Sequence, residues 1–252
     1  MIKEIQKDKL KIQVLNDRKL LGARAAEAVY KQITELLDKE PYINIIFAAA
    51  PSQNEFLAAL IEKNIDWARI NAFHMDEYIG LNADAPQGFG NFLKAGLFDK
   101  VNFRSVNYIN GNAADVEQEC LRYEGLLMEF PPHIVCMGIG ENTHIAFNDP
   151  HVAYFNDKKR VKIVDLDEEC RQQQVNDGCF SSITKVPKFA ITLTIPTLFS
   201  GKYLFCMVPG EKKARAVHHT IVQEVTEKYP STILRKHENA IMFTDAQSSV
   251  FL

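Results

Sequence analysis

The sequence predicts an α/β fold in which a mostly parallel sheet is flanked by helices. Short, nearly continuous apolar runs alternate along the chain with longer segments of helical period. Runs that are apolar on both faces are typical of strands buried in a parallel sheet, and the segments between them are long enough for crossover helices. No Pro/Gly/Ser-rich stretch or charge block divides the 252 residues, so we expect one domain spanning residues 1–252.

Six apolar runs are the expected strands, and three segments of helical period are the expected helices. The first helix has Asn16 or Asp17 as its cap, and the second begins at Asp115 and turns Leu121, Leu126 and Leu127 inward. In chain order, the strands are residues 42–48, 70–75, 134–137, 189–193, 203–208 and 240–244, and the helices are residues 17–39, 115–128 and 210–228.

The overall charge favours small-molecule chemistry. Lys and Arg number 29 against 32 Asp and Glu, so no basic excess indicates nucleic acid or an anionic membrane surface as a partner. The first eight residues lack an apolar signal-peptide core, and no run of eighteen apolar residues occurs, so we expect a cytoplasmic protein. Five cysteines without a CxxC pair indicate reduced thiols, and Cys136 and Cys206 fall inside apolar runs that predict burial.

The motif GIGENTHIAFNDP at residues 138–150 follows the expected strand 134–137 directly. Ligand sites of α/β proteins lie beyond the carboxyl ends of the strands. Gly138 and Gly140 would let the backbone approach a ligand, and the His144 imidazole can both donate and accept a proton. Asp149 could orient that ring, although a histidine satisfied by its own loop is the simpler alternative. No second His or Cys lies at ligand spacing from His144, so we expect no metal.

Acidic and anion-binding groups follow two other runs. Asp76 comes just after the run 70–75, where partial burial would raise its pKa and make it a usable base; a turn or capping role is the alternative. Ser52 and Asn54 lie where the run 42–48 leads into a helix, a place that favours an anion, although Ser52 could simply cap that helix. Lys213 lies in the first turn of the helix from Gly210, where a cation suggests a nearby anionic ligand or, equally, a solvated turn.

Four motifs in order, MDEYIGL, GIGENTHIAFNDP, VPKFAITL and GEKKA, make the chain resemble the glucosamine-6-phosphate deaminase (isomerase) family. The resemblance covers nearly the whole length and implies a modified Rossmann-like fold and a homo-oligomer, commonly a hexamer. It implies no cofactor and a sugar-phosphate substrate. The reaction it implies opens the ring of an amino-sugar 6-phosphate, moves a proton from carbon 2 to carbon 1, and releases ammonia to leave a ketose 6-phosphate.

The resemblance also assigns roles to residues. Asp76 resembles the base that moves the carbon-bound proton, His144 resembles the acid and base for ring opening, and Lys213 resembles the lysine that holds the phosphate. The remaining members of the expected site are Asn142 and Asp149 beside His144, and, for substrate and phosphate binding, Ser52, Asn54, Glu77, Gly138 and Gly140.

The chain departs from the family pattern within the site itself. Asn142 and Thr143 stand where the family usually reads Asp-Gly, and Asp149 stands where it usually has Glu. An asparagine cannot carry the negative charge that would support His144. The glycine-rich phosphate turn is replaced by residues 49–54, AAPSQN, and the expected phosphate-binding arginine has no clear counterpart, because Arg171 comes too early.

These departures keep three functions open. The first is the deaminase or isomerase. The second is a 6-phosphogluconolactonase, whose motif usually reads more like DGHTASLFP after the glycines. The third is a catalytically impaired relative that binds a sugar phosphate without turning it over.

Overall fold

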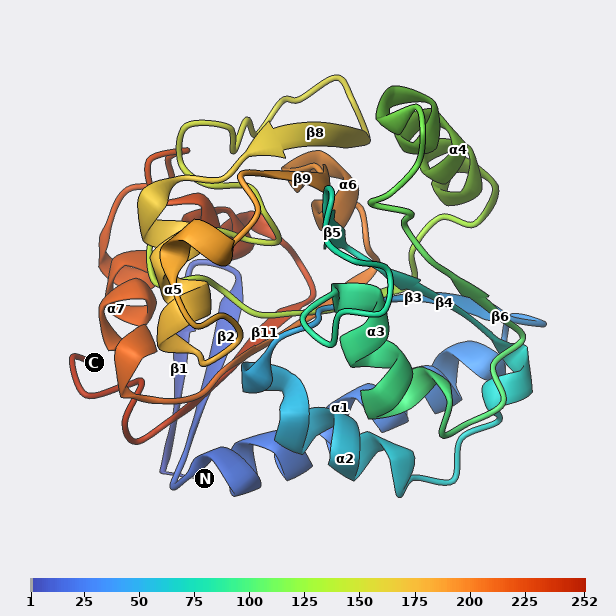
Figure 1. The fold of residues 1–252 in the computed structure, drawn as a ribbon. Helices are drawn as coiled ribbons and strands as arrows, with labels where there is room; N and C mark the ends of the chain where they lie inside the picture. The colour runs from blue at the N-terminus through green and yellow to red at the C-terminus, as the bar shows by residue number, and fades with distance from the viewer. Residues whose placement is uncertain (1) are drawn as a thin grey trace.

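The computed structural model describes residues 2–252 and confirms the α/β fold with a mostly parallel central sheet (Figure 1). Eight strands form this sheet in the order β1-β2-β11-β10-β7-β3-β4-β6. All neighbouring pairs are parallel except β1 and β2. The bounds are β1 Lys3–Lys7, β2 Leu10–Leu15, β3 Ile43–Phe47, β4 Ile70–His74, β6 Ser105–Asn107, β7 Ile134–Met137, β10 Tyr203–Val208 and β11 Ala240–Asp245.

Helices cover both faces of the sheet, and alternate strand residues point to each face. In β3, Ile45 and Phe47 pack in the cluster that contains α1 (Arg18–Leu37) and α2 (Asn54–Ile61), whereas Ile46 packs in the cluster on the other face. The second cluster receives residues of α4 (Val116–Glu129), α6 (Ile195–Phe199) and α7 (Ala214–Val222). This double coverage explains why the runs are apolar at consecutive positions.

Two predicted helix starts are confirmed by their caps. The Asp17 carboxylate accepts from the Leu20 N–H at 2.8 Å, and the Asp115 carboxylate accepts from the Gln118 N–H at 3.0 Å. The predicted inward face of α4 is wrong at Leu121, which is 60% exposed, because the buried stripe runs through Cys120, Tyr123 and Leu127 instead. The third helix ends at Val222, earlier than predicted.

The run 189–193 is a strand, but it lies outside the parallel sheet. It forms β9 (Phe189–Leu193), the centre of a three-stranded antiparallel sheet with β5 (Asp76–Tyr78) and β8 (Val161–Asp165). Asp76 pairs with Thr192 in this small sheet. The small sheet therefore holds Asp76 in place just beyond the edge of the large sheet at which β4 ends.

Two further helices complete the described fold. They are α3 (Phe89–Leu93), which continues into a π-helical turn at Lys94–Phe98, and α5 (Glu168–Asn176), which lies between β8 and β9 in the chain. A short helix, α6, follows β9. No helix within residues 2–252 is long and apolar enough to cross a membrane.

Candidate functional site

Four neighbouring parallel strands, β10, β7, β3 and β4, end at one edge of the sheet, and a cleft opens there. The cleft has about 540 Å³ of space free of protein atoms, part of it open to solvent, which suits a ligand the size of a sugar phosphate. Each of the four strands sends a segment to its wall. Among the residues that line the cleft are Ser52, Gln53, Asp76, Gly138, Gly140, His144, Gln173, Gln174, Asp177 and Lys213.

Asp76 is a buried carboxylate facing this cleft, with only 5% of its surface exposed. Burial raises its pKa well above the usual value, and the charge of neighbouring Glu77 adds to the effect. A carboxylate with a raised pKa is a stronger base than one in water. Asp76 therefore has the environment that removal of a carbon-bound proton requires.

His74 holds the turn that presents Asp76. Its Nδ1 lies 2.9 Å from the Asp76 carbonyl oxygen, and its Nε2 lies 2.8 Å from the Ile109 backbone nitrogen. Burial lowers the pKa of His74 to about 4, so the ring is neutral near pH 7. A neutral ring with its proton on Nδ1 donates to Asp76 and accepts from Ile109. This role was missed from sequence, although a histidine inside an apolar run was a signal for it.

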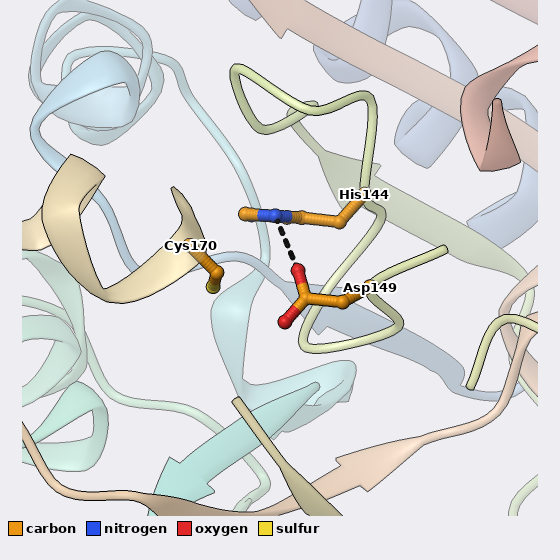
Figure 2. Close-up of side chains that lie close together, drawn as sticks. All are labelled: His144, Asp149 and Cys170. Atoms are coloured by element: carbon orange, nitrogen blue, oxygen red, sulfur yellow. Dashed lines mark ion pairs between the residues drawn. The ribbon is translucent and has the colours of Figure 1, made fainter. Parts of the chain in front are cut away.

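His144 and Asp149 lie side by side, as Figure 2 shows, and His144 lines the cleft. His144 Nδ1 is 3.0 Å from Asp149 Oδ1, although the oxygen lies off the N–H direction of a well-aligned hydrogen bond. Asp149 is fully buried, whereas His144 reaches the cleft wall. The pairing orients the ring and leaves its other nitrogen available to a ligand.

Asn142 connects this pair to a second carboxylate. Its Nδ2 donates to Asp149 Oδ1 and to Asp167 Oδ2, each at 3.0 Å, and its Oδ1 accepts from the His144 N–H at 3.1 Å. The other Asp149 oxygen accepts from the Asp167 N–H at 3.1 Å. Burial alone would raise the pKa of Asp149, but the hydrogen bonds and the His144 charge outweigh it, so the net change in pKa is downward. Asn142 thus supports Asp149 as a donor rather than as an additional charge.

The glycines of the motif provide space for the site. A Cβ on Gly140 would lie 2.2 Å from His144 Cε1, so the ring occupies the volume that any other residue would fill. A Cβ on Gly138 would lie 3.1 Å from Gln53 Nε2 and 3.3 Å from the Met207 carbonyl oxygen. Gly140 is therefore needed for the position of His144, and Gly138 for close packing of the cleft floor.

Lys213 reaches the cleft from the turn that precedes α7. This turn begins at Gly210, whose φ of 94° favours glycine and whose N–H donates to Asp245. Burial lowers the pKa of Lys213, while the negative charges of Asp177 and Glu141 act in the opposite direction. The structure thus brings Lys213 into the same cleft as Asp76 and His144.

Of three other residues predicted to bind substrate, one lines the cleft and two do not. Ser52 lines the cleft and its Oγ accepts from Gln53 Nε2 at 3.1 Å. Asn54 is exposed and is not among the residues that line the cleft. Glu77 lines a neighbouring cavity instead, where its carboxylate accepts from the backbone N–H groups of Tyr78, Phe89 and Gly90. Glu77 therefore anchors the start of α3.

Four cleft residues were missed from sequence: Gln53, Gln173, Gln174 and Asp177. Gln53 is 1% exposed, and its Oε1 has no hydrogen-bond partner within the described residues. The other three come from α5 and its C-terminal cap, a segment in which Cys170 and Val175 are the only apolar residues. No local signal identified them, because a run of adjacent polar residues does not show which of them faces a cleft.

His144, Asp149 and Cys170 also form a group whose ligand atoms lie within 4.8 Å of one another (Figure 2). Their nitrogen, oxygen and sulfur atoms are ligand types that zinc accepts. Burial, however, raises the pKa of the Cys170 thiol well above its usual value, which opposes the thiolate form that binds metals. Both Asp149 oxygens already accept hydrogen bonds. The arrangement is an imidazole paired with a carboxylate, with a neutral thiol beside it.

Comparisons with known proteins agree with this geometry. Residues 16–243 match the family described as glucosamine-6-phosphate isomerases/6-phosphogluconolactonase. Glucosamine-6-phosphate deaminase of Clostridium botulinum is 33% identical over 96% of this chain and 97% of its own length. The Bacillus cytotoxicus deaminase is 32% identical over 89% of this chain and 84% of its own.

Solved structures show the same fold. A monomeric glucosamine-6-phosphate deaminase superposes with a TM-score of 0.86 at 29% identity, covering 96% of this chain and 99% of that one. The 6-phosphogluconolactonase of Thermotoga maritima superposes with a TM-score of 0.76 at 20% identity, covering 94% and 100%, and shows likeness of fold alone. This chain, with its acid–base pair and buried base at the sheet edge, belongs to the glucosamine-6-phosphate isomerase/6-phosphogluconolactonase family.

Proposed function

We propose that the chain is an amino-sugar 6-phosphate deaminase of the aldose–ketose isomerase type. It opens the sugar ring, transfers a proton from carbon 2 to carbon 1, and adds water to release ammonia and a ketose 6-phosphate. The observation that carries the proposal is that a buried carboxylate, Asp76, and the imidazole of His144 line one cleft, with His144 paired to the buried Asp149 behind it. The curated relatives named as deaminases, which match most of the chain, support the same conclusion.

Each proposed step uses a group on the cleft wall. Asp76 removes the proton from carbon 2 and returns it to carbon 1, which its raised pKa favours. His144 moves the proton between the ring oxygen and the anomeric hydroxyl, while Asp149 and Asn142 hold its orientation. Gly138 and Gly140 form the floor, and Ser52 and Lys213 contact the end of the sugar distant from carbon 1. These steps transfer protons and use water, so we propose that they need no metal or organic cofactor.

The experiment that tests this function measures ammonia release from glucosamine 6-phosphate and, in parallel, from its galacto epimer. Asp76→Asn is the control, because the amide is nearly isosteric and cannot act as a base. Release by the wild type that drops by about a hundredfold or more in the variant supports the proton-transfer role. Ammonia at background for both sugars, in protein shown to be folded, contradicts the deaminase.

Two alternative functions predict different results in such assays. A 6-phosphogluconolactonase would hydrolyse a sugar-phosphate lactone, and the likeness to lactonase structures supports only the shared fold. A catalytically impaired relative would be stabilised by a sugar phosphate without turning it over, an idea that Asn142, the altered phosphate loop and the missing arginine motivate. Ammonia release from a hexosamine phosphate argues against both.

Location and assembly are further proposals. We propose a cytoplasmic homo-oligomer, with the resemblance implying a hexamer. The similar solved structure of a monomeric deaminase provides the alternative. Light scattering on the purified protein separates the two, since one hexamer has six times the mass of the 28.6 kDa chain. A single domain predicts one cooperative unfolding transition.

A further inference from the structure

The end of the cleft that contains Lys213 has little positive charge. Among the described residues that line the cleft, Lys213 is the only lysine or arginine. A phosphate dianion is usually held by several donors, often including a bidentate arginine or an additional lysine. One buried lysine provides half of the charge needed to balance a dianion.

The neighbouring cations are committed elsewhere. Arg171 is on α5, but its Nη2 donates to the carbonyl oxygens of Ile183 and Val186, at 2.6 and 3.1 Å. Lys212 donates from Nζ to the Asn176 carbonyl oxygen at 2.7 Å. Neither lines the cleft. Arg18 donates to the Pro51 carbonyl oxygen of the loop that precedes α2, at 3.0 Å, and pairs with Glu55, but it does not line the cleft either. Among the described residues, Lys213 is therefore the only side-chain cation on the cleft wall.

Negative charge, in contrast, lies close to Lys213. Asp177 caps α5 and lines the cleft, where its Oδ2 is 3.4 Å from Gln173 Nε2. Glu141 follows Gly140 directly, and its buried Oε1 has no hydrogen-bond partner within the described residues. Both carboxylates interact electrostatically with Lys213. The charge at this end is consequently neutral or negative before any ligand arrives.

The adjoining cavity is also uncharged. It shares Ala49, Ala50, Phe89 and Gln174 with the cleft and has about 610 Å³ of space free of protein atoms, part of it open to solvent. Its other walls are apolar or amide groups, including Pro51 and Phe92. A ligand that extends past Gln174 would meet no cation there.

We propose that Asp177 is a specificity-determining residue: it balances the charge of Lys213, so that this end of the cleft accepts a 6-hydroxyl sugar about as well as a 6-phosphate. A hydroxyl group can accept from the Lys213 ammonium and donate to the Asp177 carboxylate at the same time. Gln173 and Gln174 supply further donors and acceptors. A phosphate dianion is attracted by the Lys213 ammonium and repelled by the Asp177 carboxylate. The proposal deepens the proposed deaminase function and rests on it.

The experiment compares kcat/KM for glucosamine 6-phosphate and for glucosamine, in the wild type and in Asp177→Asn. We expect the two sugars to differ by no more than about tenfold in the wild type, and the variant to shift the ratio toward the phosphate by about tenfold or more, because a like charge is removed from the phosphate site. Asp177→Glu, which keeps the charge, should behave as the wild type. Glu168→Gln, an exposed acid on the same helix, is the matched control and should leave the ratio unchanged.

The outcomes test the role of Asp177 and the deaminase function separately. A strong wild-type preference for the phosphate, or an unchanged ratio in Asp177→Asn, overturns the role of Asp177. If neither sugar is turned over and the galacto epimer of the phosphate is inactive as well, the deaminase proposal fails, and calorimetric titration with inorganic phosphate then tests Asp177 by itself. A gain of about tenfold in phosphate affinity on Asp177→Asn supports the role, and equal affinity overturns it. Circular dichroism verifies that each variant is folded.

Discussion

Thr143, in the middle of the histidine motif, has a strained backbone that glycine would relieve. Its φ is 72°, in the left-handed region that a β-branched residue rarely adopts. The side chain is fully buried, and its hydroxyl has no hydrogen-bond partner within the described residues. The backbone is well held, since the Thr143 N–H donates to the Gly140 carbonyl at 3.1 Å and its carbonyl accepts from the Ser231 N–H at 3.0 Å. Thr143→Gly keeps these bonds and removes the strain.

The expected gain is the difference between opposing contributions. Relief of the left-handed conformation contributes about 1–2 kcal/mol, and removal of an unsatisfied buried hydroxyl about 1 kcal/mol. Loss of the buried methyl costs about 1 kcal/mol, and the greater freedom of glycine in the unfolded chain costs about 0.5–1 kcal/mol. The net expectation is a stabilisation of about 1 kcal/mol.

Urea unfolding, followed by circular dichroism, measures this difference as a shift in midpoint at constant slope. Thr143→Ala is the matched control, because it removes the same hydroxyl and methyl but retains a Cβ at positive φ. We expect the glycine variant to be more stable than the alanine variant by about 1 kcal/mol. Equal midpoints for the two variants would refute the reasoning, because the strain would then make no contribution.

Three other substitutions test the site. Gly140→Ala forces the His144 ring to move and should lower kcat/KM by about a hundredfold, whereas Gly125→Ala, with nothing within 4 Å, should leave it unchanged; equal activities would contradict the packing argument. Burial raises the pKa of Asp76 in the folded state. The contribution of this group to stability is therefore fully present below its unfolded pKa of about 4, and it is lost as the pH rises through the pKa of the folded state. Asp76→Asn should therefore be more stable than the wild type at pH 8, by about 1–3 kcal/mol in urea unfolding, with the gain shrinking toward pH 4; a gain independent of pH would exclude this account. Asn142→Asp places a third carboxylate 3.0 Å from two others and should destabilise by about 1–3 kcal/mol at pH 7.5 and less at pH 5, a difference that urea unfolding at both pH values detects.

Sequence pattern was sufficient for the centre of the fold and insufficient for its edges. Strands buried on both faces, such as β3 and β7, are continuous apolar runs and were predicted. The edge strand β1 reads KEIQK, and β8 reads VKIVD, so charged residues alternate with apolar ones and obscure the strands. The pairing of β9 with β5 and β8 depends on contacts between segments far apart in the chain, which local periodicity does not contain.

The candidate site divides in a similar way. Convergence of Asp76, His144 and Lys213 could be predicted, because each follows the carboxyl end of a strand and parallel strands share that edge. Glu77 was expected near substrate, but its position was set by free backbone N–H groups at the start of α3. The α5 contribution could not be predicted, because a polar helix that lines a cleft has the same composition as one that faces water.

The proton-transfer groups and the Lys213 end of the cleft are held by different elements, so substitutions can change one without the other. The proton-transfer groups are held by the sheet: Asp76 by His74 and the small antiparallel sheet, and His144 by Gly140 and Asn142. The Lys213 end is completed by α5, in the single connection between β8 and β9. Substitutions in that connection can alter the charge that meets the end of the sugar without moving the base or the imidazole. We therefore expect α5 and its cap to be one place where this fold can change the group it accepts at the end of the sugar, because Asp177 brings a negative charge to the cleft wall that also holds Lys213.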